Sequence, residues 1–391
     1  MMKLMNKYLV GALFLVGLLL NSAGLNAQPL SAGTSMFVYN SYSPLRSKPL
    51  NVYYHIPQGN TANMPILFVF HGDDRAGRAA VADWISAANA NGFMVFCPEF
   101  TDALYPTGDA YNLANIFVDG DNPTSSSLRP DSVWSFSQLD PLFLHIQSRT
   151  QNTRNGYIGF GHSAGGQFLH RFHLYKASNL MQKSICANPG WYTTTDFSIT
   201  FPYGLGRSPI TTERLAYAFA KPSIIQLGAQ DRDPNSAGLR HNSTVDVQGL
   251  HRFDRGNYFF NTSRQTAQTN NQTYNWTKVE EPGIGHDAAG MARRALPYVL
   301  ESFLLTSATE STSKSTITGN YNQGNLNLNG LLVHETYTLM VFTLSGAIVQ
   351  SRVISGITTM HIPLPTNLKS AMVVITNAAG KPQYRTLITQ P

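Results

Sequence analysis

The stretch YIGFGHSAGGQF, residues 157–168, decides the fold of this chain. An apolar run ends in a Gly-His-Ser-Ala-Gly-Gly cluster, and apolar residues at helical spacing follow it. This pattern predicts a buried strand that turns directly into a helix. The motif Gly161-x-Ser163-x-Gly165 falls on that turn, where a nucleophilic serine can stand on a sharp strand-to-helix elbow.

The glycines of this motif have a physical reason. A serine on such an elbow takes a sparsely populated backbone conformation, and side chains at positions 161 and 165 would collide with neighbouring backbone. The alternative interpretation is a glycine-rich connection without chemistry, and the motif alone does not decide between the two. The decision depends on what the rest of the chain places beside Ser163.

Short apolar runs alternate with helical patterns on both sides of this motif, from about Met36 to Leu305. Such alternation predicts an α/β fold with a mostly parallel central sheet flanked by helices. We expect a helix around Val81, with Gly92 as its stop signal, and a final helix over 287–305 with a kink at Pro297. The predicted strands are 50–57, 66–71, 92–98, 156–160, 183–187, 223–228 and 274–280.

Length and charge limit the possible functions. The chain has 391 residues, which is more than one hydrophobic core usually organises, so we expect two folded units. Charged residues make up 13%, and the formal net charge of +6 is spread without a basic run or a basic helix face. The sequence therefore predicts no nucleic-acid partner.

The first 27 residues predict a signal peptide. Lys3 and Lys7 precede an apolar run over 8–20, and small and polar residues follow up to Ala27. A membrane anchor is the competing interpretation, but a spanning helix needs about 20 apolar residues and this run is shorter. We expect cleavage after Ala27, export, and no transmembrane anchor in the mature chain.

The composition changes again near the C-terminus. Residues 306–316 lie in a Ser/Thr-rich tract that predicts a linker between a domain at 28–305 and a domain at 317–391. The second domain shows alternating apolar residues and turn signals at Ser345-Gly346 and Ala379-Gly380. This texture predicts a small all-β sandwich.

Three distant segments support chemistry at Ser163. His71-Gly72-Asp73 follows a buried strand, Asp231 likewise follows a strand, and His286 lies between the last strand and the final helix. Carboxyl ends of parallel strands meet at one edge of a sheet. The chain order Ser, Asp, His, each after a strand, is typical of one catalytic architecture.

Residues 36–305 resemble the α/β-hydrolases, in particular the secreted esterases that include polyhydroxybutyrate depolymerase-like and feruloyl esterase-like enzymes. The resemblance lies in VFHGDD, GFGHSAGG, LGAQDRD and GIGHD, in that order. It implies that Ser163 is the nucleophile, that His286 is the general base and acid, and that Asp231 orients His286. It also implies an oxyanion hole made by the backbone amides of Asp73 and Ala164.

Asp233 is the rival for the acidic position, because it lies two residues after Asp231. We prefer Asp231, since the family places this carboxylate at the strand end. Trp191 and Tyr192 follow the strand after the elbow and are candidates for an aromatic wall of the substrate pocket, with ordinary packing as the alternative. The segment from 232 to about 262 is long enough for a lid or specificity element.

The other histidines of the elbow region, His162, His170 and His173, are interpreted as surface or packing residues. None is spaced with cysteines or carboxylates as in a metal site, and we expect no metal and no organic cofactor. If the family's strand order holds, Cys97 and Cys186 lie on strands about 14 Å apart. A disulfide needs Cα atoms within about 7 Å, so two free, buried thiols are predicted.

The C-terminal domain resembles the sorting domain of proteins exported by the type IX (Por) secretion system of certain Gram-negative bacteria. The resemblance lies in VFTLSGAIVQSRVISG and in 361–391, with departures at 370–372 and at Arg385. It implies that the secretion machinery is a partner. A carbohydrate-binding or spacer domain is the alternative, but the domain lacks the groove aromatics that such binding needs, with Tyr337 and Tyr384 as the main candidates.

These observations predict a serine esterase that hydrolyses extracellular carboxylic esters, such as polysaccharide esters or polyesters, through an acyl-serine intermediate. The protein is expected to be secreted or attached to the cell surface after export through the periplasm. A serine peptidase of the same fold and a noncatalytic surface-binding protein are the two alternatives.

Overall fold

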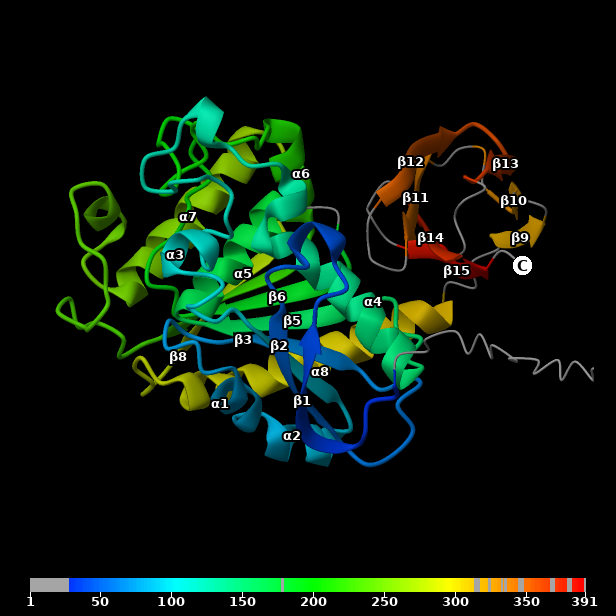
Figure 1. Ribbon diagram of the computed structural model, residues 1–391. Coiled ribbons are helices and arrows are strands. Elements are labelled where there is room, and N and C mark those ends of the chain that lie inside the picture. Colours follow the sequence, from blue (N-terminus) through cyan, green and yellow to red (C-terminus); the bar gives the residue numbers. More distant parts are fainter. Residues whose placement is uncertain are drawn as a thin grey trace, which may run out of the picture.

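The computed structural model describes residues 28–176, 179–312, 317–322, 325–331, 333, 336–343, 348–365, 370–377 and 382–389. The predicted signal peptide at 1–27 lies outside these residues, and so do the predicted turns at 345–346 and 379–380. An eight-stranded sheet lies at the centre of the first part of the chain (Figure 1).

This sheet is mostly parallel. Its strand order is β1-β2-β4-β3-β5-β6-β7-β8. The β1–β2 and β2–β4 pairs are antiparallel, whereas the other neighbours are parallel. Its strands are β1 (Gly33–Tyr39), β2 (Leu50–Ile56), β3 (Ile66–Phe70), β4 (Met94–Glu99), β5 (Tyr157–His162), β6 (Met181–Ala187), β7 (Ser223–Gly228) and β8 (Trp276–Glu281).

Helices cover both faces of the sheet. In Figure 1, α1, α2 and α8 lie on one side, and α4, α5, α6 and α7 lie on the other. Two separate clusters of buried apolar side chains fill the two faces. The helices are α1 (Gly77–Ala82), α2 (Ile85–Asn91), α3 (Thr107–Ala110), α4 (Leu139–Thr150), α5 (Ala164–Tyr175), α6 (Thr212–Ala220), α7 (Arg252–Thr269) and α8 (Ala288–Thr312), with short 3-10 turns at 43–45, 125–127, 131–133, 135–138 and 245–248.

The predicted fold class is confirmed, and every predicted strand of the first part is present. The structure adds β1, an edge strand that buries Phe37 and Tyr39 but exposes Met36 and Val38. The predicted helix around Val81 is divided into α1 and α2. Gly92 follows α2 in a left-handed conformation (φ 67°), so it ends the helix as predicted.

The last helix is longer than predicted. We expected it to end at Leu305, but α8 continues to Thr312 with Pro297 inside it. No proline or glycine lies between these two ends, so nothing in this stretch breaks the backbone hydrogen bonds of the helix. The first residues of the predicted linker are therefore helical, and 313–316 lie outside the described residues.

The cysteine prediction is confirmed. Cys97 lies on β4 and Cys186 on β6, and two strands, β3 and β5, separate them. Both thiols are free and buried. Burial raises the pKa of the Cys186 thiol to about 12, so it stays protonated and unreactive at neutral pH.

A second, all-antiparallel part follows α8. One sheet has the order β13-β10-β9 and the other β12-β11-β14-β15. Apolar side chains of both sheets form one separate core, as a small β-sandwich requires. The strands are β9 (Thr318–Asn322), β10 (Asn325–Asn329), β11 (Thr336–Thr343), β12 (Ile348–Ser355), β13 (Thr359–Pro363), β14 (Ser370–Asn377) and β15 (Pro382–Thr389).

Within the described residues, no helix is both long enough and apolar enough to cross a membrane.

Candidate active site

The turn between β5 and α5 is a strained elbow. Ser163 has φ 56° and ψ −119°, a conformation that costs a non-glycine residue about 1–3 kcal/mol. A Cβ atom at Gly161 would lie 2.3 Å from the Gly165 carbonyl oxygen, and one at Gly165 would lie 2.1 Å from the Phe70 carbonyl oxygen. The predicted steric reason for the glycines is therefore confirmed.

The structure brings Ser163, Asp231 and His286 together. The His286 Nε2 atom lies 3.0 Å from the Ser163 Oγ atom, and its Nδ1 atom lies 2.7 Å from the Asp231 Oδ2 atom. Asp231 is almost fully buried, whereas Ser163 is half-buried and His286 is exposed. A carboxylate, an imidazole and a hydroxyl in this chain of hydrogen bonds can activate the hydroxyl as a nucleophile.

Asn188 ties the loops that carry Asp231 and His286 to the sheet. It follows β6 and is buried. Its side chain donates to the Gly285 carbonyl (3.0 Å) and accepts from the Gly228 amide (2.7 Å). These two bonds hold the ends of both loops together, and the sequence motifs gave no signal of this role.

Asp233 lies away from this arrangement. Its carboxylate accepts the Asn235 amide (2.8 Å) in a local turn, and the side chain is exposed. The structure therefore places Asp231, and not its rival, against His286.

His71 fixes the loop that follows β3. The Phe100 amide donates to its Nε2 atom (3.0 Å), so the ring proton is on Nδ1, which donates to the Gly72 carbonyl (2.8 Å). The Tyr111 hydroxyl donates to the His71 carbonyl (2.7 Å). Burial lowers the pKa of His71 to about 4 and keeps the ring neutral. The loop that carries Asp73 is thus held in one conformation.

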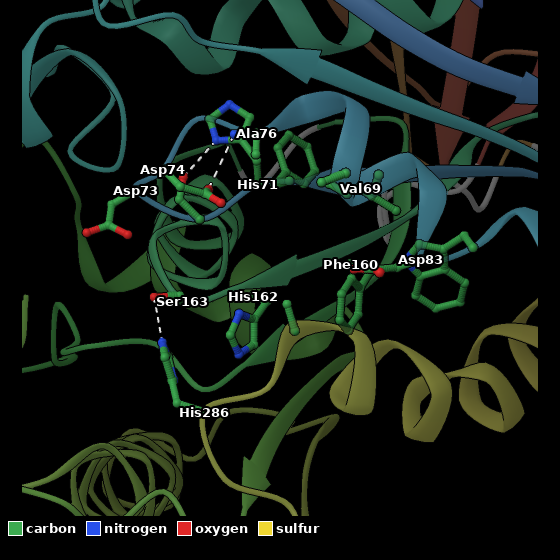
Figure 2. Close-up of a pocket in the computed structure, with 16 residues that line it drawn as sticks. Val69, His71, Asp73, Asp74, Ala76, Asp83, Phe160, His162, Ser163 and His286 are labelled. Atoms are coloured by element: carbon green, nitrogen blue, oxygen red, sulfur yellow. Dashed lines mark hydrogen bonds between the residues drawn. The ribbon is translucent and has the colours of Figure 1, made fainter. Parts of the chain in front are cut away.

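A cavity of about 260 Å³ opens beside the nucleophile. Figure 2 shows Ser163 and His286 toward one end and Asp83 toward the other. Asp73 lines the same cavity as Ser163, which is where an amide of the predicted oxyanion hole would need to lie. Ala164 directly follows Ser163 as the first residue of α5.

Two neighbours of the triad were not predicted. The His162 ring lies against His286, with ring centroids 4.5 Å apart, and its Nε2 atom has no hydrogen-bond partner among the described residues. Burial, and then the charges of His286 and Arg252, lower the pKa of His162 far below its usual range. Arg252 lies 3.6 Å from the carboxylate of Asp231. By contrast, His170 and His173 are buried packing residues, as interpreted.

Trp191 and Tyr192 do not line this cavity. Tyr192 is fully buried and stacks on Phe259, with centroids 4.4 Å apart. Trp191 lies between two guanidinium groups, with Arg171 4.3 Å and Arg240 4.9 Å from its ring centroid. These contacts direct both aromatics into the packed interior, and their contribution to a substrate pocket stays a prediction.

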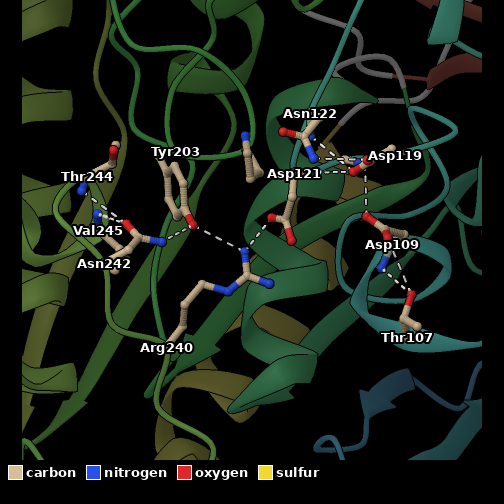
Figure 3. Close-up of polar contacts among 12 residues, drawn as sticks. Thr107, Asp109, Asp119, Asp121, Asn122, Tyr203, Arg240, Asn242, Thr244 and Val245 are labelled. Carbon is tan, nitrogen blue, oxygen red and sulfur yellow. Dashed lines mark hydrogen bonds and ion pairs between the residues drawn. The ribbon is translucent and has the colours of Figure 1, made fainter.

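The segment after Asp231 is fixed by polar contacts with a distant loop. Figure 3 shows Arg240 between Asp121 and Tyr203, at 2.5 and 3.2 Å from the acceptor oxygens, and Asn242 donates to the same tyrosine hydroxyl (2.6 Å). We expected an irregular segment up to about 262, but α7 begins at Arg252. The irregular part is therefore shorter than predicted.

The buried histidines predict acid sensitivity. Burial lowers the pKa of His71 and of His173 to about 4, and that of His170 well below its usual range. The unfolded chain takes up protons below about pH 6.5 that the folded chain rejects, so stability is full above this pH and is lost toward pH 4. His71 and His173 should each cost at most about 2 kcal/mol between pH 6.5 and pH 5.

Guanidinium unfolding at pH 7.5 and pH 5.0 measures this effect. We expect a lower free energy of unfolding at pH 5.0, and a smaller difference for His173→Gln than for the exposed control His241→Gln. Equal or greater stability at pH 5.0 would refute the assignment of neutral buried rings.

No protein-family model and no curated protein matches this chain. Solved structures do match. Poly(aspartic acid) hydrolase-1 from Sphingomonas sp. KT-1 is 34% identical, with a TM-score of 0.65, over 69% of this chain and 100% of that chain. LpqC, a poly(3-hydroxybutyrate) depolymerase from Bordetella parapertussis, is 28% identical, with a TM-score of 0.65, over 69% of this chain and 90% of that chain.

The matches cover the whole length of the first enzyme and nine-tenths of the second. The identity to the first, together with the TM-score, places this protein among the hydrolases of this fold. The chain belongs to the α/β-hydrolase family that includes poly(aspartic acid) hydrolase-1.

Proposed function

We propose that this hydrolase is a secreted serine esterase that cleaves carboxylic esters through an acyl-Ser163 intermediate. The observation that carries the proposal is the hydrogen-bonded chain from Ser163 through His286 to buried Asp231. A hydroxyl on a strained elbow, with a base and an orienting carboxylate in line, is the arrangement that acyl transfer needs.

The chemistry follows from the atoms in contact. Ser163 Oγ attacks the ester carbonyl while His286 Nε2 takes its proton. The Nδ1 proton of His286 stays on Nδ1 and is donated to Asp231 Oδ2, and the negative carboxylate stabilises the imidazolium. The amides of Asp73 and Ala164 hold the developing oxyanion. The imidazolium then gives its proton to the leaving alcohol. In the second half-reaction His286 takes a proton from water, which attacks the acyl carbonyl; the bond to Ser163 Oγ breaks, Oγ takes the proton from His286, and the carboxylic acid is released.

The charges around the cavity favour a neutral substrate. The carboxylates of Asp73, Asp74 and Asp83 line it with Ser163, and no lysine or arginine is among the described residues that line it. An anionic substrate would be repelled by these groups. A polyester or an esterified polysaccharide, which carries no charge near the scissile bond, fits this surrounding.

Hydrolysis of an amide polymer is the second candidate, because the relative named poly(aspartic acid) hydrolase-1 acts on such a polymer. Poly(aspartic acid) is a polyanion, and the carboxylates of the cavity disfavour it. The charges of the cavity therefore favour an ester over the amide polymer as the substrate of this chain. A comparison of turnover on the two substrates tests this preference.

Substrate turnover by the mature chain tests the proposal. We expect hydrolysis of short-chain p-nitrophenyl esters and of poly(3-hydroxybutyrate), weak or no cleavage of poly(aspartic acid), and loss of all turnover in Ser163→Ala. Faster cleavage of poly(aspartic acid) than of any ester would replace the esterase proposal by the amide one. Ser163→Ala that retains full turnover would refute the serine mechanism.

We also propose that the C-terminal β-domain directs secretion. Its two antiparallel sheets are the scaffold expected of a sorting domain, and its resemblance to type IX sorting domains supports this role. Deletion of 317–391 should leave the protein active but retained in the periplasm, as measured by fractionation of cells that carry this secretion system. Unchanged secretion of the truncated chain would contradict the proposal.

A further inference from the structure

The two carboxylate oxygens of Asp231 have different partners. Oδ2 accepts from the His286 ring, and Oδ1 faces the Nη1 atom of Arg252 at 3.6 Å. The side chains of Asp231 and Arg252 are 3% and 4% exposed, so water screens this pair little. The carboxylate that accepts from His286 is therefore also paired with a buried guanidinium group, which is permanently charged.

Arg252 is held in this place from both its backbone and its side chain. It is the first residue of α7, and the amide of the next residue, Phe253, donates to the Asp231 carbonyl (3.1 Å). The Arg252 Nη1 atom also donates to the Ser236 hydroxyl (2.7 Å). The start of α7 thus fixes the position of the guanidinium against the carboxylate.

We propose that Arg252 is a positioning residue of the triad, which aims Asp231 at His286 and whose charge extends the activity of Ser163 to lower pH. This inference rests on the proposed function. The positive charge of Arg252 lies against one oxygen of the carboxylate, while the His286 ring lies against the other. This charge repels further positive charge on the pair.

The groups that face His286 and Asp231 determine the sign of this effect. His286 contacts Ser163, Asp231 and the ring of His162, which burial keeps neutral. Asp231 contacts His286 and Arg252. Among the described residues, Arg252 is the only permanent cation in contact with this set. Loss of its charge should therefore move the acid limb of the pH–rate profile, the range in which the rate falls with pH, to higher pH.

The same helix offers a matched control. Arg255 is also on α7 and is fully buried, but its guanidinium donates to the Gly249 and Gly190 carbonyls (both 2.8 Å) and to Asp246 (3.0 Å). Arg255→Met removes a buried guanidinium from α7 without removing a contact of Asp231. It reports what a general loss of packing at this helix does.

The rate of covalent labelling of Ser163 by a fluorophosphonate probe, measured from pH 5 to pH 9, tests the inference. This rate depends on the triad and not on the natural substrate, so a wrong substrate class does not affect it. We expect the acid limb of the pH–rate profile of Arg252→Met to lie at higher pH than that of the wild type. Arg252→Gln, which keeps a polar side chain and removes the charge, should show the same shift.

Arg255→Met should keep the acid limb of the wild-type pH–rate profile, even if its maximal labelling rate changes. The inference is overturned if neither Arg252 variant shifts the limb, or if Arg255→Met shifts it as much. Arg252→Gln gives the answer if Arg252→Met does not fold. A wild-type chain that is not labelled at any pH would instead refute the serine mechanism itself.

Discussion

His286→Ala is expected to lower kcat for p-nitrophenyl ester hydrolysis by about 10⁶. His286 is the group that joins the Ser163 hydroxyl to Asp231, at 3.0 and 2.7 Å. Without it, no base takes the proton of the attacking hydroxyl and no acid protonates the leaving alcohol. The residual rate should come from substrate binding and the oxyanion amides alone.

The measurement is steady-state turnover of purified protein beside a thermal unfolding curve. The unfolding curve shows whether the His286→Ala variant is folded at the temperature of the assay. His241→Ala is the matched control, because His241 binds Asp246 and the Pro234 carbonyl and does not touch the triad. A tenfold loss or less in His286→Ala would contradict its role as the base.

Asp231→Asn is expected to lower kcat by about 10⁴ while the fold is kept. The reason lies in the second partner of the carboxylate. Arg252 can only donate, so the asparagine carbonyl oxygen would face Arg252 and its NH₂ group would face His286 Nδ1. This bond requires a proton on Nε2, and that tautomer cannot accept the Ser163 proton.

Asp233→Asn provides the comparison for this prediction. Asp233 accepts the Asn235 amide in an exposed turn, and an asparagine oxygen can take over that bond. Its kcat should stay within about twofold of the wild type. The reverse result, a large loss for Asp233→Asn and a small one for Asp231→Asn, would show that the acidic member of the triad was assigned to the wrong residue.

Much of the central sheet could be predicted because its strands are buried on both faces. Such strands read as continuous apolar runs, and Ile66–Phe70 is completely buried as its composition indicates. The edge strand β1 escaped prediction because only Phe37 and Tyr39 pack inward, while Met36 and Val38 face solvent. An edge strand with one buried face therefore lacks the continuous apolar run by which a central strand is predicted.

The helix boundaries were harder to predict for a different reason. Residues 252–262 contain Gly256 and several polar residues, which are poor helix formers, yet α7 runs through them. Gly256 packs so closely that a Cβ atom there would lie 2.2 Å from a Leu227 methyl group. Close packing of α7 on β7 therefore requires a glycine at this position, although glycine is a poor helix former.

The members of the candidate triad could be named from sequence because each follows a strand in a fixed chain order. Their supports could not. Arg252 contacts Asp231, the His162 ring lies against His286, and Asn188 binds the Gly285 carbonyl next to His286. These contacts join segments far apart in the chain, and a single sequence does not specify them. Trp191 illustrates the same limit, because its ring packs between Arg171 and Arg240, and no local motif predicts these contacts.

The reactivity of Ser163 tests the central claim most directly. Mature protein should be labelled by a fluorophosphonate probe with a stoichiometry of one, and peptide mass spectrometry should place the label on Ser163. Ser163→Ala and His286→Ala should show no label at neutral pH, although both stay folded. A wild-type chain that resists the probe, or a label on another serine, would contradict the assignment of Ser163 as the nucleophile.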